Sequence, residues 1–191
     1  APGPGLLVLV GAGIVLCLVY FLAYRRQPAS FTAVMGLGGA CWLAANVLYA
    51  AGRPVHVAAL WWMGFLVLTI AGGRLELSRM VPRSRGSETV FLALAAVYLA
   101  ALVLALFAYG PAGRLAGAAL LGFTLWLWRY DVARLTIRRE GLTRFIAAGL
   151  LSGYVWMTVA GVLLIAFGGV PAGLIYDAQL HAVFIGFVFS M

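Results

Sequence analysis

Long apolar runs alternate along the whole chain with short segments that contain arginine, glycine and proline. About 20 apolar residues, at about 1.5 Å per residue, are enough to cross a bilayer as a helix. By that measure we expect about seven spans, at roughly residues 5–24, 31–51, 55–72, 88–109, 112–129, 144–167 and 174–191. The run from Val90 to Leu99 does not alternate apolar and polar residues, which argues against a β-barrel. The sequence therefore predicts an all-α fold, a polytopic transmembrane helix bundle forming a single domain over residues 1–191.

The composition supports an integral membrane protein. Hydrophobic residues make up 65% of the chain and charged residues only 9%, so almost every segment is apolar on all sides. The formal net charge is +8, but the arginines lie between the apolar runs, where they orient helices. We therefore expect the lipid bilayer as the surroundings of this chain, and no nucleic acid as a partner.

The arginines divide unequally between the two sides of the predicted bundle. By the positive-inside rule, the side with more arginines is cytoplasmic. Only Arg53 and Arg114 fall on the poorer side, whereas the richer side holds Arg25, Arg26, Arg74, Arg79, Arg83, Arg85, Arg129, Arg134, Arg138, Arg139 and Arg144. The pattern predicts a multi-pass protein of the cytoplasmic membrane with its N-terminus outside and its last span running inward.

The connections between the predicted spans have recognisable patterns. Residues 130–141 mix apolar and charged positions, so they form either a short interfacial helix or a solvated loop. Residues 110–113 and 168–171 contain glycine and proline and predict tight external turns. The last apolar run stops at Met191 without polar residues after it, and we expect the chain to be a piece of a larger bundle.

Several classes of membrane protein are disfavoured by missing residue types. The chain has no lysine, so it lacks the Schiff-base residue that a retinal protein requires. Its two histidines are too few for a two-haem cytochrome b core. Cys17 and Cys41 lie within apolar runs without metal-ligand spacing, and we interpret them as small buried hydrophobic residues.

The histidines, His56 and His181, are the candidate ligand residues. Each lies within about one turn of the predicted external end of its span, roughly 3 to 7 Å deep. A matched depth is necessary for two axial ligands of one haem or for a shared copper ion. The alternative is that each imidazole bonds a backbone carbonyl or interfacial water.

Other polar and aromatic side chains within the spans have a structural explanation as well as a functional one. Asn46 either bonds a ligand or joins two helices, and the second use is the more common. Tyr154 and Trp156 lie on different faces of the sixth predicted span, where packing is the default role.

Four short motifs resemble those of the NnrS family of membrane proteins, which is associated with denitrification and nitric oxide stress. The segment from His181 to Met191 resembles the family's His-Ala, Gly and Met pattern, and residues 153–161 resemble the preceding tyrosine and tryptophan helix. Residues 70–74 resemble its glycine-glycine-arginine helix end, and residues 45–48 its alanine-asparagine helix. Order and spacing agree from about residue 31 onward.

The resemblance implies a haem protein with a role in nitric oxide handling or electron transfer. Family members have about a dozen spans and are described as containing haem and copper, so this chain corresponds to a later portion. His181 is then the expected axial ligand and His56 a second one, with Gly186, Tyr154 and Trp156 shaping the haem pocket. Phe184, Phe187 and Phe189 replace small or polar residues, and Tyr49 stands where some relatives have histidine. These departures weaken the case for copper more than the case for haem.

Two other functions fit the same composition. A cofactor-free subunit of a larger membrane complex would need only helices that pack well, and its partners would be the other subunits. A small-molecule transporter would need polar groups clustered at the midplane of the membrane. Asn46, Cys17 and Cys41 form only a small set for that purpose.

Overall fold

The computed structural model describes residues 4–81 and 86–191, which form helices and their connections without any strand. The chain divides into two compact units, residues 1–73 and residues 74–191, each with its own packing. The prediction of an all-α fold is confirmed for these residues, while the prediction of a single domain stays a prediction. Arg83 and Arg85, two of the arginines on which the predicted topology depends, lie outside the described residues.

Within the described residues, 5 helices are long and apolar enough to cross a membrane. They are α1 (Pro4–Arg26), α2 (Ser30–Ala50), α3 (Val55–Leu77) with the 3-10 turn Ser78–Met80 that follows it, α4 (Ser87–Leu104) and α7 (Gly141–Phe167). Each corresponds to one predicted span.

The two remaining predicted spans are helical but differ from these five. α5 (Tyr109–Tyr130) has 22 residues and includes Arg114 and Arg129. α8 (Leu174–His181) continues into a π-helical segment, Ala182–Phe187, and together they form a shorter apolar helix. The helices lie where the sequence predicts them, and the number of spans stays a prediction.

The predicted turn at Gly110 and Pro111 is wrong. α4 ends at Leu104 and α5 begins at Tyr109, so the turn lies at residues 105–108 and the span predicted at 88–109 is shorter. Pro111 lies in the first turn of α5, where its missing N–H costs nothing because these amides have no partner within the helix. The other predicted turn is found at the predicted place, since Gly168, with φ 70°, ends α7 and the connection continues to Gly173. Its external side stays a prediction.

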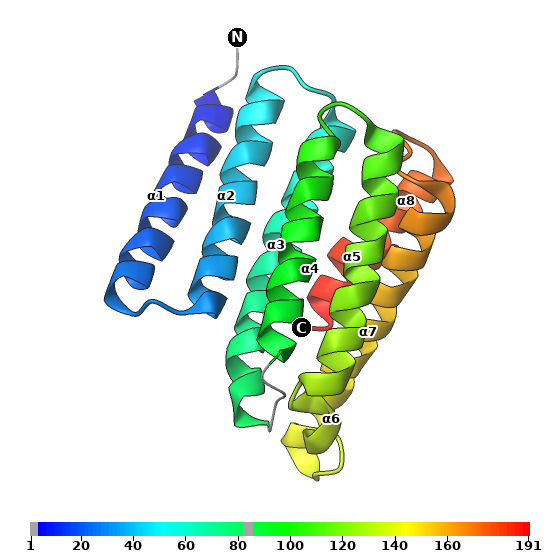
Figure 1. The fold of residues 1–191 in the computed structure, drawn as a ribbon. Coiled ribbons are helices and arrows are strands. Elements are labelled where there is room, and N and C mark those ends of the chain that lie inside the picture. Colours follow the sequence, from blue (N-terminus) through cyan, green and yellow to red (C-terminus); the bar gives the residue numbers. More distant parts are fainter. Residues whose placement is uncertain (1–3, 82–85) are drawn as a thin grey trace. The chain divides into compact units, whose positions relative to one another are not determined.

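In the first unit, α1 and α2 lie side by side and α3 packs against α2 through small residues (Figure 1). A Cβ atom on Gly38 would come within 2.6 Å of Thr69 Oγ1, so the two helices approach closely there. Asn46 is 1% exposed, and its Oδ1 accepts a hydrogen bond from Trp62 Nε1 at 3.2 Å. Asn46 therefore joins α2 to α3, which is the more common use predicted for it.

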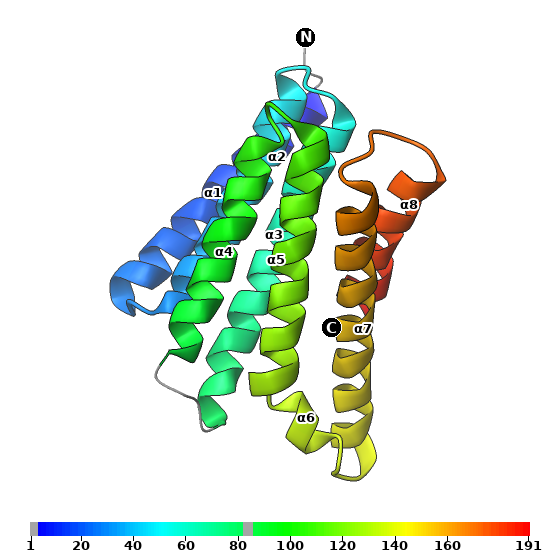
Figure 2. The ribbon, with the colours of Figure 1, turned by 45° about the vertical axis from the view of Figure 1, so that its right-hand side comes forward.

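In the second unit, α5 packs against α4 on one side and against α7 on another (Figures 1 and 2). Phe91 of α4 meets Phe123 and Trp126 of α5 edge-on, with ring centroids 5.1 and 4.7 Å apart. A Cβ atom on Gly117 would come within 2.7 Å of the Gly161 carbonyl oxygen, so α5 and α7 meet backbone to backbone. Close contacts between small residues are typical of helices in membranes.

A short helix, α6 (Ala133–Thr136), forms in the connection between α5 and α7, at one end of the second unit (Figure 2). The backbone N–H of Ala133 donates to Asp131 Oδ1 at 2.7 Å and so fixes the start of this helix. Of the two predictions for residues 130–141, the short helix is confirmed at these four residues.

Candidate functional site

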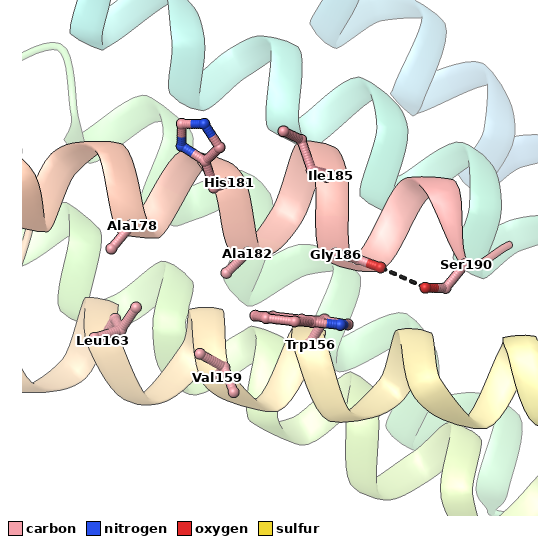
Figure 3. Close-up of a pocket in the computed structure, with 9 residues that line it drawn as sticks. All are labelled: Trp156, Val159, Leu163, Ala178, His181, Ala182, Ile185, Gly186 and Ser190. Carbon is pink, nitrogen blue, oxygen red and sulfur yellow. Dashed lines mark hydrogen bonds between the residues drawn. The ribbon is translucent and has the colours of Figure 1, made fainter.

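An open groove of about 380 Å³ lies between α7 and the last helical segment, within the second unit (Figure 3). Most of its lining side chains are apolar, and His181 is the only titratable one. The lining residues are Trp156, Val159 and Leu163 from α7 and Ala178, His181, Ala182, Ile185, Gly186 and Ser190 from the last segment. Three of the five residues predicted to bind a cofactor, His181, Gly186 and Trp156, are among them.

In the imidazole of His181, one nitrogen forms a hydrogen bond and the other can bind a ligand. Its Nδ1 lies 2.6 Å from the carbonyl oxygen of Asp177, one turn earlier in α8. Because a carbonyl oxygen only accepts hydrogen bonds, Nδ1 carries the proton and donates it, and in the neutral ring Nε2 is left with its lone pair. A hydrogen bond from the other ring nitrogen to a carbonyl is the usual way in which a metal-binding histidine is oriented.

The His181 side chain lies at the rim of the groove and points away from α7, to the side that we call the open side. In Figure 3, His181 and Ile185 project from the last segment away from α7, whereas Ala178 and Ala182 point toward α7. His181 and Ile185 are correspondingly exposed, Ile185 at 54%. A ligand that bound Nε2 would therefore lie on the open side and not between His181 and Trp156.

Gly186 and Trp156 form the floor of the groove. A Cβ atom on Gly186 would collide with the Trp156 ring, so only glycine lets the indole lie flat against the backbone of the last segment (Figure 3). Gly186 belongs to the π-helical segment, and the Ser190 hydroxyl donates to the Gly186 carbonyl oxygen at 2.6 Å. Single π-helical turns are rare and frequently occur at functional sites.

Gln179 connects α8 to the end of α7, a role that the sequence did not indicate. Its side chain is 3% exposed, and Nε2 donates to the carbonyl oxygens of Gly168 at 2.9 Å and Leu163 at 3.4 Å. Carbonyl groups at a helix end lack partners within the helix, so this amide satisfies them. A glutamine two residues before His181 in an apolar helix was the signal available in the sequence.

A second polar cluster of the same unit contains an ion pair that the sequence does not indicate. Arg74, in the last turns of α3, contacts Asp131 with two N–H groups, Nε at 2.6 Å and a terminal nitrogen at 2.5 Å. The side chain of Asp131 is only 1% exposed and that of Arg74 13%. From the sequence, Arg74 is one of the topology-determining arginines of a connection. The signal in the sequence for a partner of Arg74 was Asp131, an isolated acidic residue directly after an apolar run.

Tyr154 belongs to this cluster and not to the groove. Its side chain is 0% exposed, and its hydroxyl lies near both the Arg74 guanidinium and the Asp131 carboxylate without a hydrogen bond of good geometry. Tyr154 is not among the groove-lining residues. The structure therefore separates Tyr154 from Trp156, although the two are adjacent in the predicted site.

His56, the other predicted ligand, lies in the first turn of α3 in the first unit and is partly exposed. Its pairing with His181 stays a prediction. Within the described residues, no group of three or more His, Cys, Asp or Glu side chains lies close enough to hold a metal ion.

Comparison with known proteins gives one family. No curated protein and no solved structure matches the chain. A family model described as a domain of unknown function (DUF8744) matches residues 2–191, nearly the whole sequence. The chain belongs to the DUF8744 family.

Proposed function

We propose that the chain is a multi-pass protein of the cytoplasmic membrane with seven spans and an external N-terminus. The five long apolar helices support this proposal, together with eleven arginines on one predicted side against two on the other. α5 and the segment Leu174–Phe187 are the two further spans. In this arrangement the start of α8, and with it His181, lies toward the external face.

Site-directed labelling tests the orientation. Ala51 lies between α2 and α3 on the predicted external side, and Glu140 precedes α7 on the predicted cytoplasmic side; both are exposed. With Cys17 and Cys41 replaced by alanine, A51C should react with a membrane-impermeant maleimide in intact cells and E140C only after lysis. The reverse result would require the opposite orientation.

We further propose that this chain is an NnrS-like membrane haem protein that handles or senses nitric oxide or supports electron transfer, with His181 as an axial ligand. The observation that supports it best is the state of the His181 ring. Its Nδ1 is bound to Asp177, and its Nε2 is directed to the open side of an apolar groove. An imidazole in hydrocarbon is costly unless it has a partner, and a ligand at Nε2 would supply one.

Haem fits this site better than a copper ion held by the protein alone. A haem brings four nitrogen donors of its own and needs only one or two axial ligands from the chain. A copper site needs several imidazole or sulfur ligands together, and the described residues contain no cluster of three such groups. His56 is the weaker candidate for a second axial ligand.

The residues of the chain would act on a bound haem in three ways. His181 would hold the iron, with the Asp177 carbonyl fixing its tautomer and raising its basicity. Ile185, which projects on the same side of the last segment as His181, would exclude water near the ring and so influence the redox potential. The haem would supply reversible binding of nitric oxide or one-electron transfer.

An optical spectrum tests the haem proposal. Protein expressed with a supply of haem and purified in detergent should show a Soret band whose position changes on reduction, and His181→Ala should lose or shift it. His56→Ala is the comparison variant and should have a smaller effect. Protein without a Soret band would rule out the proposal, and stable association with other membrane proteins would then favour a cofactor-free subunit.

A further inference from the structure

The connection between α5 and α7, with the helix ends on either side, has a composition unlike the rest of the second unit. This basic connection, residues 129–146, combines arginines with large apolar side chains that are both exposed. We propose that it binds the headgroups of anionic phospholipids in the adjoining leaflet of the membrane. The inference does not depend on the haem proposal, because it uses none of the groove residues.

The charges in the basic connection are strongly unbalanced. Glu140 is its only exposed acid, since its other acid, Asp131, is buried against Arg74. Within the described part of the chain, Arg138, Arg139 and Arg144 make no ion pair. The exposed basic residues are Arg129, Arg138, Arg139 and Arg144. This surface therefore has several guanidinium groups that lack an anionic partner from the protein.

Exposed apolar side chains lie among these arginines. Leu135 is 47% exposed, Leu142 73% and Phe145 77%. On a surface in water, this much apolar area beside charged groups would be unfavourable. At the boundary between headgroups and acyl chains it is favourable, because apolar side chains enter the acyl region while arginines extend to the phosphates.

The position of the connection is fixed by the buried ion pair. Asp131 accepts hydrogen bonds from Arg74 on one side and from the Ala133 N–H on the other, so the start of α6 is tied to the end of α3. α6 in turn packs against α7. Arg138 and Arg139 follow α6, and their backbone N–H groups donate to the carbonyl oxygens of Leu135 and Thr136. Less backbone entropy is therefore lost when a headgroup binds these two arginines.

Charge complementarity and continuity with the apolar helices favour a lipid as the occupant. Arginine binds phosphate oxygens with two parallel N–H groups, and α5 and α7 lead from the basic connection directly into apolar segments. A lipid with a net negative headgroup balances the unpaired arginines, whereas a zwitterionic lipid brings its own cation. We therefore expect selection for anionic lipids over phosphatidylcholine.

The test measures lipid selectivity in vesicles. The full chain is reconstituted in phosphatidylcholine with spin-labelled phosphatidylglycerol or spin-labelled phosphatidylcholine, and the motionally restricted fraction of each is determined by electron paramagnetic resonance. Wild-type protein should prefer phosphatidylglycerol. Arg138→Gln with Arg139→Gln should lower that preference at least about twofold, because each arginine near the surface contributes up to about fivefold in binding.

Two controls make the result specific. Arg114→Gln removes an arginine from the opposite end of α5 and should leave the selectivity unchanged. High salt should reduce the wild-type preference, because exposed charges are screened. Equal restriction of the two lipids by wild-type protein, or equal selectivity in wild type and double variant, would overturn the proposal. If the double mutation instead dissociated a dimer without changing lipid selectivity, the surface would be a protein interface.

Discussion

The second unit contains two polar sites, and their polar side chains are satisfied in different ways within an apolar protein. The Arg74, Asp131 and Tyr154 cluster is closed: both charges are paired, and the carboxylate also accepts the Ala133 N–H. The groove at His181 is open, and the ring has one nitrogen bonded within its own helix and the other directed outward. In an apolar protein, the closed arrangement fits a structural role, and the open one is where we propose a ligand.

The comparison predicts that the closed site contributes most to stability. Arg74→Ala or Asp131→Ala should each lower the free energy of unfolding by about 3 to 5 kcal/mol, because an unpaired buried charge remains. Chemical unfolding in mixed micelles, followed by circular dichroism, measures the change. The double variant Arg74→Met with Asp131→Leu should recover much of the loss, since it leaves no charge behind. Additive losses in the double variant would mean that the two residues act independently.

A smaller loss is expected where α5 meets α7. Gly117→Ala places a methyl group within 2.7 Å of the Gly161 carbonyl oxygen, which is backbone and cannot move aside cheaply. We expect a destabilisation of about 1 to 3 kcal/mol in the same unfolding measurement. Gly110→Ala, in the same helix, has no neighbour within 4 Å of the added methyl group and serves as the control. Equal effects of the two substitutions would contradict close packing at Gly117.

The support of the groove should contribute less again. Gln179→Leu keeps most of the side-chain volume but removes the N–H donor to Gly168 and Leu163, at a cost of about 1 kcal/mol. The same substitution should also perturb the haem spectrum modestly, because Gln179 holds α8 against α7. A change in the spectrum without a change in stability would assign Gln179 a direct part in ligand binding.

The open site should contribute least to stability. His181→Ala removes an exposed side chain whose one hydrogen bond to the described part of the chain is within its own helix. We expect a change within about 0.5 kcal/mol for protein without haem. Unfolding of haem-free protein measures this. A loss comparable to that of Asp131→Ala would show that His181 is structural and would remove the distinction between the two sites.

Much of the fold followed from the sequence because it depends on local properties. Apolar runs of sufficient length specify helices almost without reference to their neighbours, so each predicted span is helical in the structure. The errors in the predicted helices concern where a helix begins or ends. Pro111 lies in the first turn of α5 and not in a turn between helices. Proline is compatible with both positions, and only the contacts of α5 decide between them.

The sites were harder to predict from the sequence than the helices, because they depend on which helix faces are turned toward each other. The sequence indicated His181, Gly186 and Trp156, and these line one groove. It did not pair Arg74 with Asp131, which are 57 residues apart. The different faces predicted for Tyr154 and Trp156 agree with the structure, whereas the family resemblance had placed both residues in one haem pocket. Side chains two positions apart on a helix are separated by about 200° around its axis, so the rings of Tyr154 and Trp156 face different surroundings.

Chemical rescue of His181 tests the central claim most directly. His181→Gly removes the imidazole and leaves space for free imidazole on the open side of the groove. We expect this variant, prepared with haem, to lack the wild-type spectrum and to regain it when imidazole is added. The double variant Arg74→Met with Asp131→Leu should keep the wild-type spectrum with and without imidazole. A wild-type spectrum of His181→Gly without imidazole would contradict the assignment of His181 as the ligand.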